Sequence, residues 1–182
     1  MIFQHFVTKS HESNLYVIAC SKTREAALID AGTFDPQVVE YAKSEGLKVR
    51  LLLLTHSHWD HTDGLMDYTQ AFNCQALSFN EMHDGHMLKV GTLALQVLHT
   101  TGHTDDSISI YVENGGCVFT GDALFAGSIG GTSSPRQKQE EIEHIQQKLL
   151  RLPPATIVYS GHGPATSIGV EKRFNPFLQD KI

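Results

Sequence analysis

The sequence predicts a mixed α/β protein, and two features of the chain lead to that fold class. One is the order of its elements, because a group of short apolar strands precedes helical patterns and this β-then-α order then occurs a second time. The other is its size, since 182 residues, 41% of them hydrophobic, can bury one sizeable core. No internal repeat, low-complexity segment or linker divides the sequence. We therefore expect a single domain over residues 1–182.

The first half of the chain is expected to form strands and then helices. Three short β candidates, separated by polar turns, cover residues 3–7, 15–20 and 26–30. A helix over residues 36–44 should follow, because Asp35 suits the N-cap, Pro36 suits the first helical position and Gly46 ends the helix. Residues 49–54 are a continuous apolar run, as in a strand covered on both faces. Residues 62–72 are expected to be helical.

The second half repeats this order. A hairpin-like region begins at Asp84-Gly85 and runs to residue 91, and strands are expected over residues 93–98, 107–112 and 117–120. Residues 137–150 form an amphipathic helix, which Pro153 and Pro154 prevent from continuing. A last strand is expected over residues 156–160.

Composition excludes several classes of function. The formal net charge is −6 and no basic run occurs, which argues against a nucleic-acid partner. The first 18 residues contain polar and charged side chains and do not resemble a signal peptide, and no apolar run is long enough to span a membrane. The three scattered cysteines indicate small core residues in a reducing compartment. We expect a cytoplasmic enzyme with a small-molecule substrate; the oligomeric state stays open.

The most informative segment is residues 55–61, Thr-His-Ser-His-Trp-Asp-His, directly after the apolar run 51–54. His56 and His58 lie two apart, so on an extended segment they project to the same side and can bind one ion. Asp60 and His61 follow after the chain turns and can reach a second ion. Imidazole and carboxylate ligands are typical of catalytic zinc, iron or manganese sites.

Four further segments each place a candidate ligand beside glycine at the end of a strand. Glycine lets the backbone approach closely and adopt dihedral angles that other residues avoid. The candidates are His103 in 101–104, Asp122 in 119–122, His162 in 160–163 and Asp30 in 28–32.

The remaining histidines and the only tryptophan are expected to have no role in the site. His5, His11 and His144 should face solvent, and His83 and His86 should be exposed turn residues. His99 ends a strand near the site and is assigned no function. Trp59 is expected to anchor the metal loop by packing.

These ordered motifs resemble the metallo-β-lactamase superfamily, and within it the short glyoxalase II-like (hydroxyacylglutathione hydrolase-like) hydrolases. The resemblance extends from Asp30 to residues 171–177. It implies a four-layered αββα sandwich with the metals at one edge of the two sheets. It also implies a ligand set: His56, His58 and His103 for the first metal, Asp60, His61 and His162 for the second, and Asp122 bridging both. Asp30 would orient a ligand or the bridging water.

The same resemblance implies an activity. Members hydrolyse acyl thioesters of glutathione, such as S-lactoylglutathione, by a metal-bridging hydroxide that Asp60 and Asp122 would hold and orient. Two divalent ions are expected, zinc first, although iron or manganese would suit the same ligands. The partner would be a small-molecule thioester, possibly derived from glutathione.

Three departures from the family predict weak binding of glutathione. We expect the chain to lack most of the C-terminal helical extension that contributes to glutathione binding. Gly131 and Ser133 stand where the family usually has Arg and Asp, and residues 102–107 read Gly-His-Thr-Asp-Asp-Ser instead of Gly-His-Thr-Pro-Gly-Ser. Lys172 and Arg173 are the remaining cations that could contact glutathione carboxylates. The metal ligands themselves are intact.

Several alternatives remain open. One is a lactonase or another hydrolase of the fold. A second is a mononuclear iron dioxygenase acting on glutathione persulfide, against which the missing Arg at Gly131 counts. A non-enzymatic binding module is the alternative of a different class, and the intact ligand set argues against it. True β-lactamases are disfavoured because they typically lack the aspartate that Asp122 supplies.

Overall fold

The computed structural model describes residues 1–179, and its first half forms a five-stranded sheet in the order β1-β2-β3-β4-β5. Strands β1, β2 and β3 pair antiparallel, whereas β3, β4 and β5 pair parallel. The strands are β1 (Ile2–Val7), β2 (Asn14–Ala19), β3 (Glu25–Ile29), β4 (Lys48–Leu53) and β5 (Gln75–Leu77).

The second half forms a six-stranded sheet in the order β13-β12-β9-β8-β7-β6. In this sheet β12 pairs parallel with β9, and every other pair is antiparallel. The strands are β6 (Met87–Val90), β7 (Leu93–His99), β8 (Ile108–Val112), β9 (Cys117–Gly121), β12 (Ile157–Ser160) and β13 (Thr166–Ser167), and a separate small hairpin consists of β10 (Leu124–Phe125) and β11 (Ser128–Ile129).

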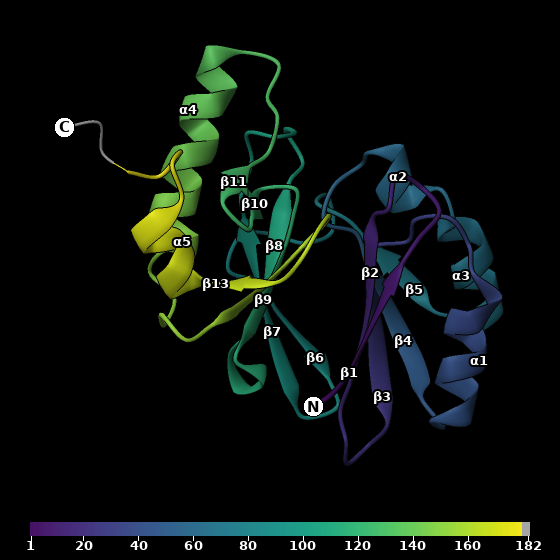
Figure 1. Cartoon of the computed structure of the whole chain (residues 1–182). Helices are drawn as coiled ribbons and strands as arrows, with labels where there is room; N and C mark the ends of the chain where they lie inside the picture. The colour runs from purple at the N-terminus through teal and green to yellow at the C-terminus, as the bar shows by residue number, and fades with distance from the viewer. Residues whose placement is uncertain (180–182) are drawn as a thin grey trace.

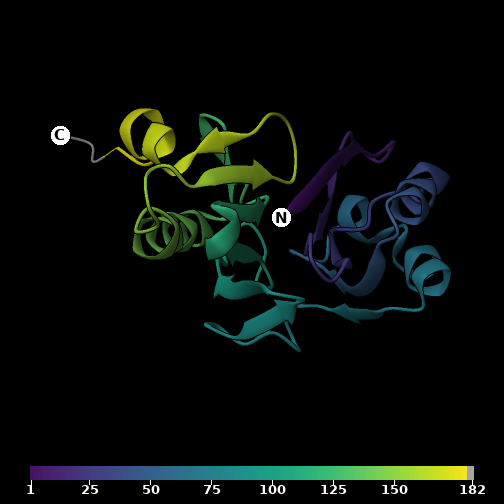
Figure 2. The same cartoon turned by 90° about the horizontal axis from the view of Figure 1, so that it is seen from below.

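Helices cover the outer face of each sheet (Figures 1 and 2). Helices α1 (Pro36–Ser44) and α3 (Leu65–Phe72) lie against the first sheet, and α4 (Pro135–His144) and α5 (Ile168–Phe174) lie against the second. A π-helical turn, η2 (Ile145–Leu149), continues α4. The predicted four-layered αββα sandwich is therefore confirmed. No helix among residues 1–179 is both long and apolar enough to cross a membrane.

Strand β2 shows why both faces of a sheet are apolar. Side chains alternate along a strand, so Tyr16 and Ile18 point into the core between the two sheets, while Leu15 and Val17 point toward the helices. All four are buried. Each sheet therefore packs on both faces against apolar side chains. The loops at one edge of the sheets lie outside these apolar layers and can carry polar groups.

The predicted elements mostly agree with the structure. Helix α1 begins as expected, since the Gln37 amide donates to Asp35 Oδ1 at 2.9 Å. The predicted helix over 62–72 is confirmed as α3 from Leu65 onward, whereas Thr62 belongs to a separate preceding helix, α2 (Trp59–Thr62). The division occurs at Gly64, whose amide donates to Ala31 and Gly32 carbonyl oxygens at 2.8 and 2.9 Å in the loop after β3.

Candidate metal centre

The candidate ligands and Asp30 lie in loops that follow five different strands at one edge of the two sheets. Asp30 follows β3, and residues 56–61 follow β4 and enter α2. His103 lies in the loop after β7, Asp122 directly follows β9, and His162 follows β12. Strands of both sheets therefore deliver polar side chains to one place, as the sequence predicted.

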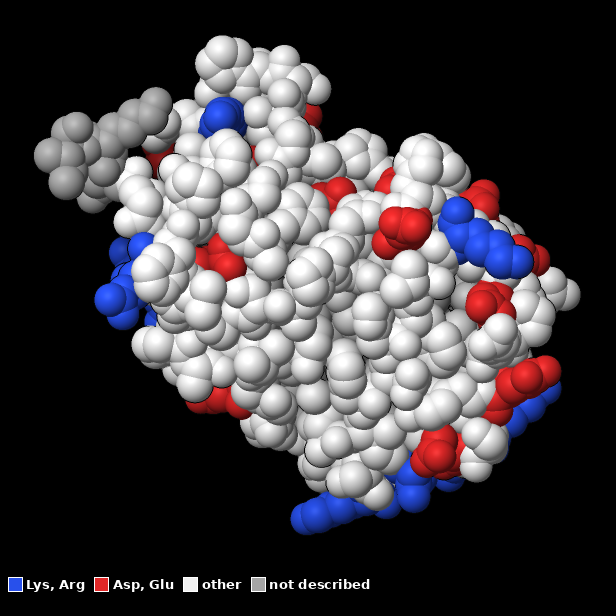
Figure 3. Space-filling view, in the orientation of Figure 1, with Lys and Arg blue, Asp and Glu red and all other residues white. Residues whose placement is uncertain are grey.

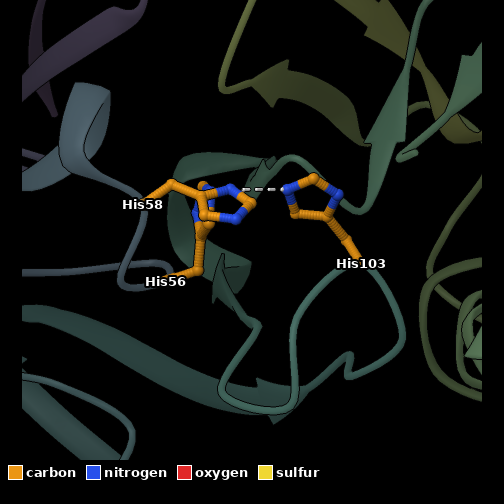
Figure 4. A group of neighbouring side chains, drawn as sticks. All are labelled: His56, His58 and His103. Carbon is orange, nitrogen blue, oxygen red and sulfur yellow. Dashed lines mark hydrogen bonds between the residues drawn. The ribbon is translucent and has the colours of Figure 1, made fainter. Parts of the chain in front are cut away.

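Three imidazoles form the first group (Figure 4). His56 Nε2 lies 3.2 Å from His58 Nδ1, which in turn lies 3.0 Å from His103 Nε2. Zinc bound by nitrogens at about 2.0–2.1 Å in tetrahedral geometry separates those nitrogens by about 3.3 Å. The spacing of this group is therefore that of ligands to a single ion.

The second group contains Asp60, His61 and His162. His162 Nε2 is 3.3 Å from His61 Nε2 and 3.2 Å from Asp60 Oδ2. Asp122 lies between the groups: its carboxylate is 3.4 Å from His61 Nε2 in the second group and 3.6 Å from His103 Nε2 in the first. Its position suits a ligand shared by two ions.

Asp30 organises both groups at once. Its Oδ2 accepts from His61 Nδ1 at 2.9 Å and from the Thr55 hydroxyl at 2.9 Å, and its Oδ1 accepts from the Thr55 amide at 2.8 Å. The Thr55 oxygen lies 3.1 Å from His56 Nδ1 and can accept from it. With Nδ1 protonated on both rings, each Nε2 keeps its lone pair for a metal.

His103 is oriented by the main chain. Its Nδ1 donates to the Gly131 carbonyl oxygen at 2.7 Å, which again leaves Nε2 free to bind. Gly131 is exposed, and a Cβ built on it would meet no atom within 4 Å. The residue where the family usually has Arg thus orients a ligand through its backbone and leaves open space beside the site.

Burial and charge set the protonation of these side chains before an ion binds, and an ion bound at His61 Nε2 would displace a proton. Burial of His56 lowers its pKa to about 2, so its imidazole is neutral. Burial of His61 opposes protonation, but Asp30 and Asp122 outweigh it and raise the pKa of His61 to about 10. Burial disfavours the Asp122 anion, but the neighbouring His61 imidazole outweighs it and lowers the pKa of Asp122 to about 2. The bridging position is therefore anionic at neutral pH.

The residues present fit divalent ions. Asp122 Oδ1 is buried and has no hydrogen-bond partner among the described residues. A buried carboxylate oxygen without a partner is costly, and a cation would remove that cost. The imidazole lone pairs that converge on the centre also indicate a cation, because without one these lone pairs repel each other. The donor set is nitrogen and carboxylate oxygen, which suits zinc, iron or manganese and does not select among them.

Two glycines allow the loops to approach. Gly121 has φ of +50°, and a Cβ there would lie 2.4 Å from the Thr55 hydroxyl oxygen. A Cβ on Gly161 would lie 2.1 Å from Asp122 Oδ1. Neither position can carry a side chain without displacing a group of the site.

Outside the seven candidate ligands, Trp59 and His144 differ from expectation, and the structure places His99, to which no role was assigned. Trp59 was expected to be a packing anchor, but it is 56% exposed, so that prediction is wrong. His144 is half-buried and donates from Nδ1 to the Thr101 carbonyl oxygen at 2.9 Å, so it does not simply face solvent. His99 is half-buried and stacks on Phe79.

Four other histidines lie as expected: His5, His11, His83 and His86 are exposed. All three cysteines are free; Cys20 and Cys117 are buried and Cys74 is half-buried.

Three functional neighbours could not be found from the sequence. The Ser13 hydroxyl donates to the Asp60 carbonyl oxygen at 2.6 Å, and the Asn14 side-chain amide donates to the Ser160 carbonyl oxygen at 2.9 Å. Glu141 of α4 is fully buried behind the His103 loop, has no partner among residues 1–179, and burial raises its pKa to about 8. The hydrogen bonds of Ser13 and Asn14 join residues far apart in the sequence, and none of the three residues belongs to a motif.

The face shown in Figure 3 carries no large basic patch, and its Lys and Arg side chains lie toward the margins. This distribution agrees with the acidic net charge of −6. It gives no support to a phosphate-rich partner on this face.

Comparisons with known proteins agree with this geometry. The family model described as "Metallo-beta-lactamase superfamily" matches residues 10–87 and 84–162. The chain is 33% identical to the hydroxyacylglutathione hydrolase GloC of Haemophilus influenzae, over 87% of this chain and 89% of that protein.

Two solved structures are also similar over almost the whole chain. One is the BLEG-1 B3 metallo-beta-lactamase, with a TM-score of 0.91 and 30% identity, covering 98% of this chain and 100% of that chain. The other is ETHE1 from Myxococcus xanthus, with a TM-score of 0.86 and 32% identity, covering 97% of this chain and 84% of that chain.

Proposed function

The chain belongs to the metallo-beta-lactamase superfamily, and we propose that it is a binuclear metal-dependent hydrolase of acyl thioesters, including those of glutathione. The observation that carries the proposal is the convergence of five imidazoles and two carboxylates, with Asp122 in reach of both groups. Similarity to a hydroxyacylglutathione hydrolase supports the thioester class.

The proposed ligands divide between two ions. His56, His58 and His103 would bind the first, Asp60, His61 and His162 the second, and Asp122 both. When bound, two such ions supply an activated water and a Lewis acid for a carbonyl oxygen at neutral pH.

The chain's own residues fix how a substrate can approach. His56, Asp60 and His61 are buried, whereas His58 is exposed and His103 and His162 are half-buried. A carbonyl group can therefore reach the centre only from the side of the exposed ligands. Asp60 and Asp122 would accept hydrogen bonds from a water held at the centre and so orient it. Asp30, through Thr55 and His61, keeps the buried imidazoles in the ligating tautomer.

Glutathione itself should be held weakly. The position where the family usually has Arg is Gly131, which has open space beside it and offers no side chain. Loss of a contact that acts equally on substrate and transition state raises KM and leaves kcat unchanged. We expect hydrolysis of S-lactoylglutathione with a high KM.

Turnover of four substrates by the metal-loaded protein tests the proposal. We expect hydrolysis of S-lactoylglutathione to exceed opening of a simple lactone and of a β-lactam, the last included because of the similarity to BLEG-1. Lactone opening without thioester hydrolysis would reassign the enzyme to the lactonases. Oxidation of glutathione persulfide, with iron bound to one site only, would reassign it to the dioxygenases.

Replacing Gly131 by Arg directly tests the expected weak binding of glutathione. The open space should admit the longer side chain, and its carbonyl oxygen would still orient His103. A partly exposed charge contact should lower KM for S-lactoylglutathione by up to about fivefold. Gly131→Met, which adds length without charge, is the matched control. If both variants lower KM equally, the absence of a positive charge at residue 131 is not the cause of weak glutathione binding.

A further inference from the structure

The exposed indole of Trp59 has no role in the centre described so far. Trp59 lies between the candidate ligands His58 and Asp60 at the start of α2, yet it is 56% exposed. Its immediate neighbour His58 is also exposed, whereas Asp60 is buried. The largest apolar side chain of the metal loop is therefore open to solvent, next to the exposed candidate ligand His58.

A second loop holds the indole in place. The rings of Trp59 and His11 meet edge to face, with centroids 4.8 Å apart. His11 and Glu12 both have positive φ, +48° and +55°, which is uncommon for residues other than glycine. Such a backbone persists only where its surroundings fix it, and here it turns the His11 ring onto the indole.

The loop that carries His11 is tied to both halves of the centre. Ser13 donates its hydroxyl to the Asp60 carbonyl oxygen at 2.6 Å. The main-chain amide of Asn14 donates to the carbonyl oxygen of Gly161, the residue directly before His162, at 2.7 Å. Trp59 thus has a fixed position relative to ligands of both ions, as a binding contact requires.

A second aromatic ring lies near His162. Phe125, at the end of β10, is half-buried, and its ring centroid lies 6.4 Å from that of His162. Apolar surface is thus present near the centre, whereas Gly131 provides no cation. Apolar contact is the recognition that these residues offer.

We propose that Trp59, supported by His11, is a specificity-determining residue that contacts an apolar arm of the substrate beside the scissile bond. This inference rests on the proposed thioester hydrolysis. The arm is aliphatic or aromatic and uncharged, and it belongs either to the acyl group or to the thiol. Each methylene that the indole covers should raise kcat/KM by about fourfold.

Trp59 is the only tryptophan in the chain, so its fluorescence reports contact directly. The probes are non-hydrolysable thioethers, S-methyl to S-hexyl glutathione, titrated into the metal-loaded protein. We expect a saturable change in emission, with a dissociation constant that falls as the alkyl group lengthens. A shift in apparent affinity on His11→Ala would follow from loss of the supporting ring.

Kinetics with two substrate series identify the arm. One series lengthens the acyl group at constant thiol, and the other lengthens the thiol at constant acyl group. The rise of kcat/KM with chain length should vanish in Trp59→Ala, persist in Trp59→Phe, and appear in one series only. Met66→Ala is the matched control, because Met66 is 77% exposed on the neighbouring helix α3.

Three outcomes would overturn the proposal. Thioester hydrolysis with no change in emission on titration would show that Trp59 does not contact the ligand, while the proposed function would stand. An equal loss of kcat for all chain lengths in Trp59→Ala would indicate a general effect on the metal loop. Dissociation of an oligomer by Trp59→Ala in size-exclusion chromatography would assign the indole to an interface. Saturable binding without any thioester hydrolysis would instead contradict the proposed function and leave the contact in place.

Discussion

Replacing Asp30 by Asn should weaken metal binding although the side chain keeps its shape. The carboxylate accepts three hydrogen bonds, from the Thr55 amide, the Thr55 hydroxyl and His61 Nδ1, at 2.8 to 2.9 Å. An amide can accept only through its oxygen, and the Thr55 amide requires that oxygen at the Oδ1 position. The new NH₂ group would then face His61 Nδ1. His61 must give up its Nδ1 proton and carry it on Nε2, where a metal should bind.

The magnitude follows from the role of such partners. Loss of a residue that orients a metal ligand commonly costs 10- to 100-fold in metal affinity, which is about 1.4–2.7 kcal/mol. We expect this loss at the site of His61, with a smaller loss at the site of His56, which Asp30 reaches only through Thr55.

Competition with a chromogenic chelator measures both dissociation constants on metal-free protein. Asp35→Asn is the matched control, because Asp35 caps α1 and Asn caps a helix equally well. Unfolding of each metal-free variant should be compared first. If Asp30→Asn remains folded and binds both ions within about twofold of the wild type, the assigned role of Asp30 is wrong.

Other substitutions test separate parts of the site. Asp122→Ala should lower turnover by at least about 100-fold, because it removes an anionic ligand from both ions; normal activity and metal content would refute the bridge. Gly161→Ala places a methyl group 2.1 Å from Asp122 Oδ1, so we expect loss of metal by elemental analysis and about 1–3 kcal/mol lower stability in urea unfolding. Glu141 has a pKa raised by burial to about 8, so the unfolded chain loses this proton above about pH 4.5 while the folded chain keeps it. The unfolding free energy of the metal-free protein should therefore fall between about pH 4.5 and 8 relative to Glu141→Gln, and an identical pH dependence of the two proteins would contradict this.

The fold was predictable because its signals are local. Consecutive residues carry the signals for these elements: apolar runs predict β2, β4 and β9, and capping residues predict α1. The ordered motifs then identified the αββα sandwich. The short strands β5, β10, β11 and β13 were missed, since two or three residues carry no detectable periodicity. The break between α2 and α3 was missed because a loop 32 residues away supplies the acceptors for Gly64.

The candidate ligands were also accessible from the sequence, because each lies in a dense or glycine-flanked motif. Their assignment to two ions remains a prediction. What supports them was not accessible: Ser13 and Asp60 are 47 residues apart, and Asn14 and Ser160 are 146 apart. Trp59 was expected to anchor the metal loop by packing, whereas it is 56% exposed at the start of α2.

Metal stoichiometry tests the binuclear centre most directly. The protein should be stripped with chelator, reconstituted with excess zinc, desalted and measured by elemental analysis against protein concentration. We predict two ions per chain, falling to one or fewer in His61→Ala. One ion per chain in the wild type, unchanged in His61→Ala and His162→Ala, would contradict a binuclear centre.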